Sequence, residues 1–188
     1  MKFLKLGLAS LVASSVLFAG NYNVDASHSN VGFSVKHMMI TNVTGKFNDV
    51  SGNFEYDEKT NTLKALSGDI IVASINTADE KRDTHLKAEE LFDAAKFPKI
   101  NFNATKIQEN AVYGDLTMKG ITKNIKLELE NGGTVTDPWG KQRAGFELVG
   151  KINRKDFGIT WNKVLETGGV AVGEEIKLQI AMEGILAK

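Results

Sequence analysis

Apolar and polar residues alternate one by one in separate stretches of this 188-residue chain, and no other feature restricts its fold as strongly. In the stretch 30–37, the large apolar residues Val31, Phe33 and Val35 alternate with small or polar ones. Neighbouring residues of a β-strand point to opposite faces, so this pattern makes one face apolar. The pattern recurs in the stretches 50–56, 100–105, 112–118, 125–130, 146–152 and 176–182. We predict a strand in each, and an eighth in 63–77, which is apolar on both faces.

Most of these stretches are joined by short links that contain turn-forming residues, for example Lys119-Gly120 and Asn131-Gly132-Gly133. Short links place successive strands side by side in opposite directions. Antiparallel strands with one apolar face each can close into a barrel that leaves no free edge. We therefore predict an all-β fold, an eight-stranded antiparallel barrel. A sandwich of two sheets is the competing architecture.

A longer interval, residues 77–96, is predicted to contain one or two short helices between the third and fourth strands. Thr77 is followed three residues later by Glu80, which has the form of a capping box. Leu86 and Phe92 can share an apolar stripe, and Phe97-Pro98 would end the segment. We expect this helical insertion to lie across the sheet.

The N-terminal residues have the composition of a secretory signal. Lys2 and Lys5 precede an apolar run from Leu6 to Phe18, and Ala19-Gly20 offers small residues for cleavage. Cleavage after Ala19 divides the chain into a signal peptide, residues 1–19, and one domain, residues 20–188. A retained membrane anchor is the alternative, but the run is shorter than the roughly 20 apolar residues that span a bilayer.

Composition restricts the compartment and the partners. The chain has no cysteine, and an exported chain without disulfides fits the bacterial periplasm. Its 23 basic residues balance 23 acidic ones without forming a basic cluster, so no nucleic-acid partner is expected. No second apolar run is long enough to predict stable membrane insertion after the signal is cleaved.

The interior of such a barrel can be filled by side chains or can be hollow. Small residues on the inward rows, such as Gly52, Gly114, Gly150 and Gly184, favour a cavity. The alternative is that these glycines only allow the strands to coil while larger neighbours fill the space. A cavity with such walls would hold an extended apolar ligand. The residues predicted to line or cap it are Phe33, Val35, Phe54, Phe102, Leu116, Leu127, Phe146, Leu148, Phe157, Trp161 and Ile180.

The chain also resembles a known family through a series of ordered motifs. These are Val24-Asp25, His28-Ser29, Val31, Phe33, Val35, His37, Gly45, Phe47, Thr77, Arg82-Asp83, His85-Leu86, Phe92, Phe97 to Phe102, Gly114 to Thr117, Gly120 to Lys123 and Asn153 to Gly158. Together they are similar to the signature of the YceI-like, polyisoprenoid-binding family. The resemblance implies a lipocalin-like barrel around a long hydrophobic pocket for isoprenoids or similar amphiphilic lipids. It also implies export to the periplasm in many members, and homodimers among some of them.

Few polar residues are placed to contact a ligand. His37 lies at the end of an apolar strand face, and it is a candidate for contact with a polar head group. Arg82 is a second candidate, because a guanidinium suits a lipid diphosphate. A structural role is the alternative for both residues, and for Arg82 this would be a charge pair with Asp83.

The remaining histidines do not predict a metal or catalytic site. His28 and His37 are an odd number of residues apart, so a continuous strand would point them to opposite faces. Asp25, His28 and Ser29 are too close in sequence to form a hydrolytic relay, and no nucleophile elbow surrounds any serine. We expect them to form hydrogen bonds around the first strand.

These observations predict a periplasmic protein that carries or sequesters a long-chain amphiphilic lipid, such as a polyisoprenoid or an isoprenoid quinone. Neither catalysis nor a cofactor is required. An enzyme or redox helper acting on an isoprenoid quinone is one alternative, and it would need His37 together with a nearby acid. A filled barrel that acts as a stress-related interaction protein is the other.

Overall fold

The computed structural model describes residues 19–166 and 168–188. The predicted signal peptide therefore lies outside the described residues, except for Ala19. No helix in the described part of the chain is long and apolar enough to cross a membrane.

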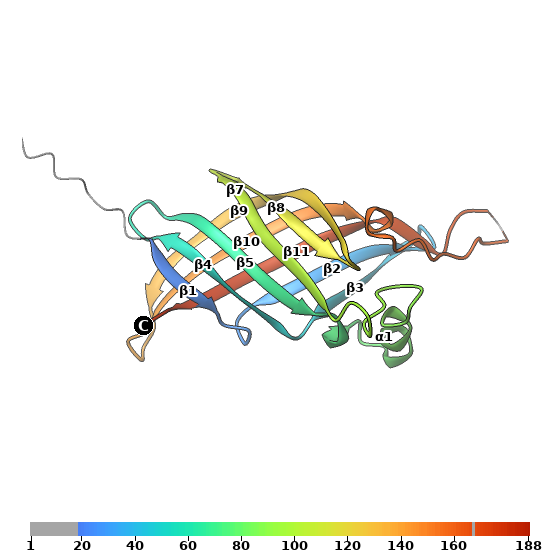
Figure 1. The fold of residues 1–188 in the computed structure, drawn as a ribbon, viewed down its shortest axis with the longest axis horizontal. Coiled ribbons are helices and arrows are strands. Elements are labelled where there is room, and N and C mark those ends of the chain that lie inside the picture. The colour runs from blue at the N-terminus through green and yellow to red at the C-terminus, as the bar shows by residue number, and fades with distance from the viewer. Residues whose placement is uncertain (1–18, 167) are drawn as a thin grey trace, which may run out of the picture.

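Strands dominate the described structure and close into the predicted barrel (Figure 1). The strands are β1 (Gly20–Val24), β2 (Asn30–His37), β3 (Thr41–Phe47), β4 (Val50–Asp57), β5 (Thr62–Ile71), β6 (Ile75–Asn76), β7 (Lys99–Gln108), β8 (Ala111–Met118), β9 (Ile121–Thr136), β10 (Gln142–Asn153) and β11 (Val172–Leu186). All pairings are antiparallel, and β1 pairs with both β4 and β11. That second pairing closes the ring, so the architecture is the barrel and not the two-sheet sandwich.

Several strands share a position in the ring, so the eleven strands fill eight positions. The C-terminal end of β11 pairs with β1, and an earlier part of β11 pairs with β2. The strands β1 and β2 therefore lie end to end beside β11 and occupy one position in the ring. In the same way β4 pairs with β1 and β3 pairs with β2. The sequence pattern did not predict β1 or β3. The predicted strand 63–77 is interrupted by a 3-10 turn, η1 (Val72–Ser74), which separates β5 from β6.

The helical insertion contains one α-helix, α1 (Glu80–Leu86). Its N-cap is Asp79, whose side chain accepts a hydrogen bond from the backbone N–H of Arg82. The predicted capping box at Thr77 is therefore wrong. Thr77 instead donates through its hydroxyl and its N–H to Asp83 Oδ1, at 2.6 and 2.9 Å. These bonds fasten α1 to the end of β6, beside one end of the barrel (Figure 1).

A candidate lipid-binding cavity

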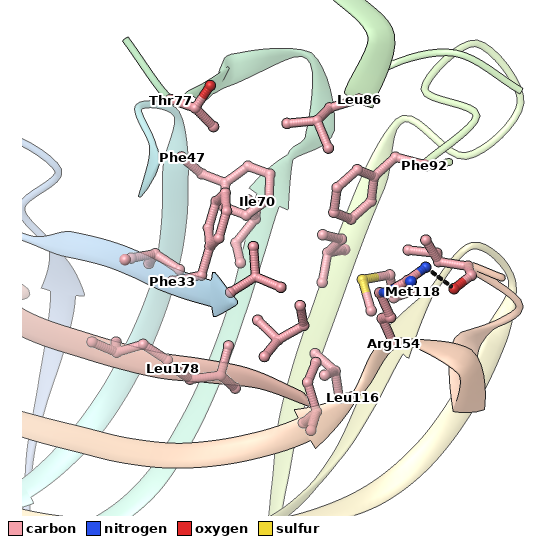
Figure 2. Close-up of a pocket in the computed structure, with 18 of the residues that line it drawn as sticks. Phe33, Phe47, Ile70, Thr77, Leu86, Phe92, Leu116, Met118, Arg154 and Leu178 are labelled. Atoms are coloured by element: carbon pink, nitrogen blue, oxygen red, sulfur yellow. Dashed lines mark hydrogen bonds between the residues drawn. The ribbon is translucent and has the colours of Figure 1, made fainter. Parts of the chain in front are cut away.

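One half of the barrel interior contains a cavity of about 390 Å³. This volume lies within the range of about 300–1,000 Å³ that is typical of small-molecule sites. Its walls are the inward-facing residues of the strands, which are almost all large and apolar (Figure 2). They include Val31, Phe33, Val35, Ile70, Ile100, Phe102, Leu116, Leu127, Leu148, Ile152, Leu178 and Ile180.

The other half of the barrel is filled with side chains. Tyr22 and Phe54 stack with ring centroids 5.4 Å apart, and Phe146 meets Phe54 edge-on at 5.0 Å. These three rings are at most 2% exposed. The prediction that Phe54 and Phe146 line the cavity is therefore corrected, because both rings belong to the packed half. The cavity has one blind end.

The glycines of the inward rows do not create the vacancy. A side chain at Gly114 would lie 2.6 Å from Phe102 Cε2, and one at Gly184 would lie 2.5 Å from Phe54 Cε1. The space above each glycine is thus occupied by a neighbouring aromatic ring, an arrangement in which the ring covers a strand glycine. The cavity therefore lies between large inward side chains and not above Gly114 or Gly184.

The opening of the cavity is bordered by the helical insertion and by the chain that follows β10. Leu86, Leu91 and Phe92 of the insertion line the cavity and pack beside Phe47 of β3 (Figure 2). The Phe47 and Phe92 ring centroids lie 6.1 Å apart. The insertion therefore supplies an apolar wall of the mouth, which the sequence pattern had placed only across the sheet.

Trp161, in the chain that follows β10, also lines the cavity and lies against the insertion. Its ring meets the His85 ring edge-on at 4.8 Å, and His85 Nε2 lies 3.0 Å from Glu90 Oε1. Phe157, the last residue of the 3-10 turn η2 (Arg154–Phe157), is by contrast 1% exposed and does not line the cavity, because it packs in a core cluster with Val31 and Ile159. The prediction that it lines the cavity is corrected.

The family model of the YceI-like domain matches residues 22–184. The chain belongs to the YceI-like family. It is 41% identical to the UPF0312 protein SA2479 of Staphylococcus aureus. The alignment spans 165 residues, which are 87% of this chain and 96% of that protein.

Solved structures show the same fold as this YceI-like chain. The YceI protein of Campylobacter jejuni is 30% identical, with a TM-score of 0.69 over 98% of this chain and all of that one. A polyisoprenoid binding domain from Saccharophagus degradans is 14% identical, with a TM-score of 0.67 over 90% of this chain and 100% of that one. The second likeness shows the fold alone.

The two predicted head-group residues of this YceI-like protein both line the cavity at its mouth. Arg82 donates from Nε to Thr77 Oγ1 and from Nη2 to the Thr77 carbonyl, both at 2.7 Å. Its nearest carboxylate is Asp79 at 3.9 Å, so the predicted pair with Asp83 is not formed. Among the described residues, no carboxylate is hydrogen-bonded to His37, the partner that the quinone-enzyme alternative requires.

Sequence reasoning did not place Arg154 at the cavity, although this residue carries the buried charge of the YceI-like mouth (Figure 2). Arg154 is 4% exposed. Its guanidinium donates to four backbone carbonyls, those of Gly173, Ile159, Trp161 and Val172, at 2.8–3.3 Å. Burial lowers its pKa below the ordinary value, while the charge of Glu174 raises it.

The charge of Arg154 has no bonded counter-ion within the described part of the chain. Glu174, the carboxylate that acts on it, is itself paired with Lys155. The sequence does contain a signal for the turn η2, which carries Arg154. Asn153 caps η2 by accepting from Lys155 N–H at 2.9 Å, and Gly158 ends it with φ 74°. A cap and a glycine this close together predict one tight turn at the barrel rim.

The predicted polar cluster around the first strand lies outside the cavity. Asp25 Oδ2 lies 2.9 Å from His28 Nδ1 and accepts from Arg143 Nη1 at 2.9 Å. Arg143 also donates to Asp137 and Glu183. Asp25, His28 and Glu183 lie close enough to suggest metal ligands, but the guanidinium of Arg143 already occupies both carboxylates. The cluster, which we call the Arg143 clasp, ties the end of β1 to β10 and β11.

Proposed function

We propose that this protein binds one long-chain amphiphilic lipid, such as a polyisoprenoid or an isoprenoid quinone, with its tail in the cavity. The observation that carries the proposal is an apolar cavity that ends at the packed rings of the other half of the barrel. Each methylene group moved from water into such a site contributes about 0.8 kcal/mol. No bond needs to be made or broken, so the mechanism is desolvation of the tail and recognition of the head.

The charge of the mouth supports a head group that carries negative charge or exposed oxygen atoms. Lys36, Arg82 and Arg154 line the cavity, and one carboxylate, Asp69, lines it as well. Asp69 is already engaged, because it accepts from Lys99 Nζ at 3.1 Å and from the Asn101 amide. Cationic side chains lining the cavity therefore outnumber carboxylates, which suits phosphate, carboxylate or quinone oxygens.

We further propose that the protein works in the periplasm as a carrier or store for this lipid. The support is the N-terminal sequence, which has the composition of an export signal, and the absence of cysteine from the chain. The named polyisoprenoid binding domain of Saccharophagus degradans shares the fold and supports the ligand class by analogy.

Mass spectrometry of an organic extract from the purified protein tests the proposal, because a lipid of this class should co-purify in a one-to-one ratio. Leu178 faces the cavity and Gln179 is exposed on the opposite strand face, so they provide a matched pair. Leu178→Trp should displace the lipid and weaken binding of a fluorescent fatty acid, while Gln179→Trp should leave both unchanged. Equal binding by the two folded variants would place the ligand outside the cavity and refute the proposal.

A further inference from the structure

Large apolar side chains are exposed on two loops at the open end of the barrel. Met38, Met39 and Ile40 form the turn between β2 and β3, and they are 43%, 57% and 82% exposed. Val164, in the loop that follows η2, is 83% exposed. Leaving such side chains in water costs free energy that a contact would recover.

The two loops are joined into one structural unit. Met38 N–H donates to the Ala171 carbonyl at 2.8 Å, and His37 pairs with Val172 across β2 and β11. Ala171 N–H in turn donates to the Lys163 carbonyl at 2.9 Å, next to Val164. We call Met38, Met39, Ile40 and Val164 the apolar tip. Figure 1 shows both loops beyond the same end of the barrel.

The turn that carries Met38, Met39 and Ile40 has a strained backbone. Met38 and Met39 have φ of 49° and 63°, and Ile40 N–H donates to the His37 carbonyl at 3.1 Å. Both central residues are therefore in the left-handed region, where glycine and asparagine are favoured. Methionine there combines backbone strain with exposure of an apolar side chain, and a strained, exposed position of this kind suggests a function.

The apolar tip borders the cavity directly. Lys36 and His37 at the end of β2, and Ala171 and Val172 at the start of β11, line the cavity, whereas none of the four tip residues does. Further exposed apolar residues, Val135 and Trp139, lie in and after β9 near the filled end of the barrel. The tip is therefore placed where a ligand enters.

We propose that the apolar tip enters the interfacial layer of a lipid bilayer, so that the ligand passes between bilayer and cavity without crossing water. This inference rests on the proposed function, because an apolar ligand dissolves in a bilayer and not in water. Two protruding turns suit a fluid layer, whereas a protein partner would need a groove to receive them. Within residues 36–40 and 163–166 the charged residues are Lys36, Lys163 and Glu166, and this excess of positive charge suits anionic headgroups.

Flotation with vesicles of equimolar phosphatidylethanolamine and phosphatidylglycerol tests the proposal. The triple variant Met39→Asp, Ile40→Asp and Val164→Asp should partition into the vesicle fraction at least about tenfold less than the wild-type protein. A matched variant at the other end of the barrel, Val135→Asp with Trp139→Asp, should float like the wild type. The triple variant should also exchange a fluorescent fatty acid between vesicles more slowly.

The proposal is overturned if the wild-type protein does not float, or if the triple variant floats as well as the control. It is also overturned if the tip holds two copies of the chain together, which light scattering would show as a dimer that only the triple variant loses. Binding of a short-tailed, water-soluble fluorescent fatty acid, measured without vesicles, separates failure of the bilayer proposal from failure of the proposed lipid binding. The triple variant should retain that binding, because none of its three positions lines the cavity.

Discussion

Gly114→Ala should destabilise the barrel because the ring of Phe102 occupies the space above that glycine. The new methyl group would lie 2.6 Å from Phe102 Cε2 and 2.7 Å from the Asn103 carbonyl oxygen. Ordinary contacts between carbon atoms are about 3.5–4.0 Å long, so the ring must move by about 1 Å. Overpacking of this kind costs about 1–3 kcal/mol. For a chain of this length, each kcal/mol lowers Tm by about 2–4 °C.

A double-mutant cycle separates the ring from other causes. In the background Phe102→Leu the clash with the ring is absent, so Gly114→Ala should cost about 1 kcal/mol less than in the wild type. Urea unfolding followed by circular dichroism measures all four proteins. Gly68→Ala is the control, because its methyl group would meet only the Ser51 carbonyl at 3.3 Å, and its Tm should change little. The same cost in both backgrounds would refute the assignment to the ring.

Three further outcomes follow from the charged and phenolic groups. Hydrogen bonds from Ser27, His28 and Arg143 hold the pKa of Asp25 well below its ordinary value. The ionised Asp25 therefore stabilises the fold above about pH 4, and this stabilisation is lost as the pH falls. The urea concentration at the midpoint of unfolding should fall less between pH 7 and pH 3 in Arg143→Met than in the wild type. Burial, with a hydrogen bond to Glu58, raises the pKa of Tyr22 to about 12, so absorbance should show one phenol ionising last, and this step should be missing in Tyr22→Phe. Arg154→Lys should leave carbonyls of the mouth unpaired, at about 1–3 kcal/mol each, and limited proteolysis should cut the loop 159–171 faster.

The alternation of side chains predicted the barrel because the period of two is a local property that each strand displays independently. It identified the inward faces of β4, β8 and β10 from residues such as Phe54, Leu116 and Leu148, which are buried as expected. It missed β1, which is only five residues long, and β3, in which only Val43 and Phe47 are large and apolar; each is continued by the next strand at the same position in the ring. Whether two segments share one position depends on pairing with distant strands, and a local pattern does not contain that information.

The shape of the interior could be predicted only in part. Sequence reasoning took inward glycines as vacant space, but Phe102 covers Gly114 and Phe54 covers Gly184. A side chain on one strand fills the gap left on its neighbour, so the volume depends on register between strands. The position of Arg154 at the cavity could not be predicted either. Its hydrogen-bond partners are backbone carbonyls within residues 159–173, and the residues next to Arg154 in the sequence do not indicate them.

The blind end of the cavity predicts how affinity depends on tail length. Because Tyr22, Phe54 and Phe146 close the far half, a tail can enter only from the mouth, and its head must then stay near Arg82 and Arg154. Each added methylene should therefore improve Kd about fourfold, from about 0.8 kcal/mol, until the tail reaches the rings. Beyond that length a longer tail must lift the head from the cations or leave methylenes in water, so affinity should stop rising. A titration series of saturated fatty acids measures this limit, and a channel open at both ends would show no such limit.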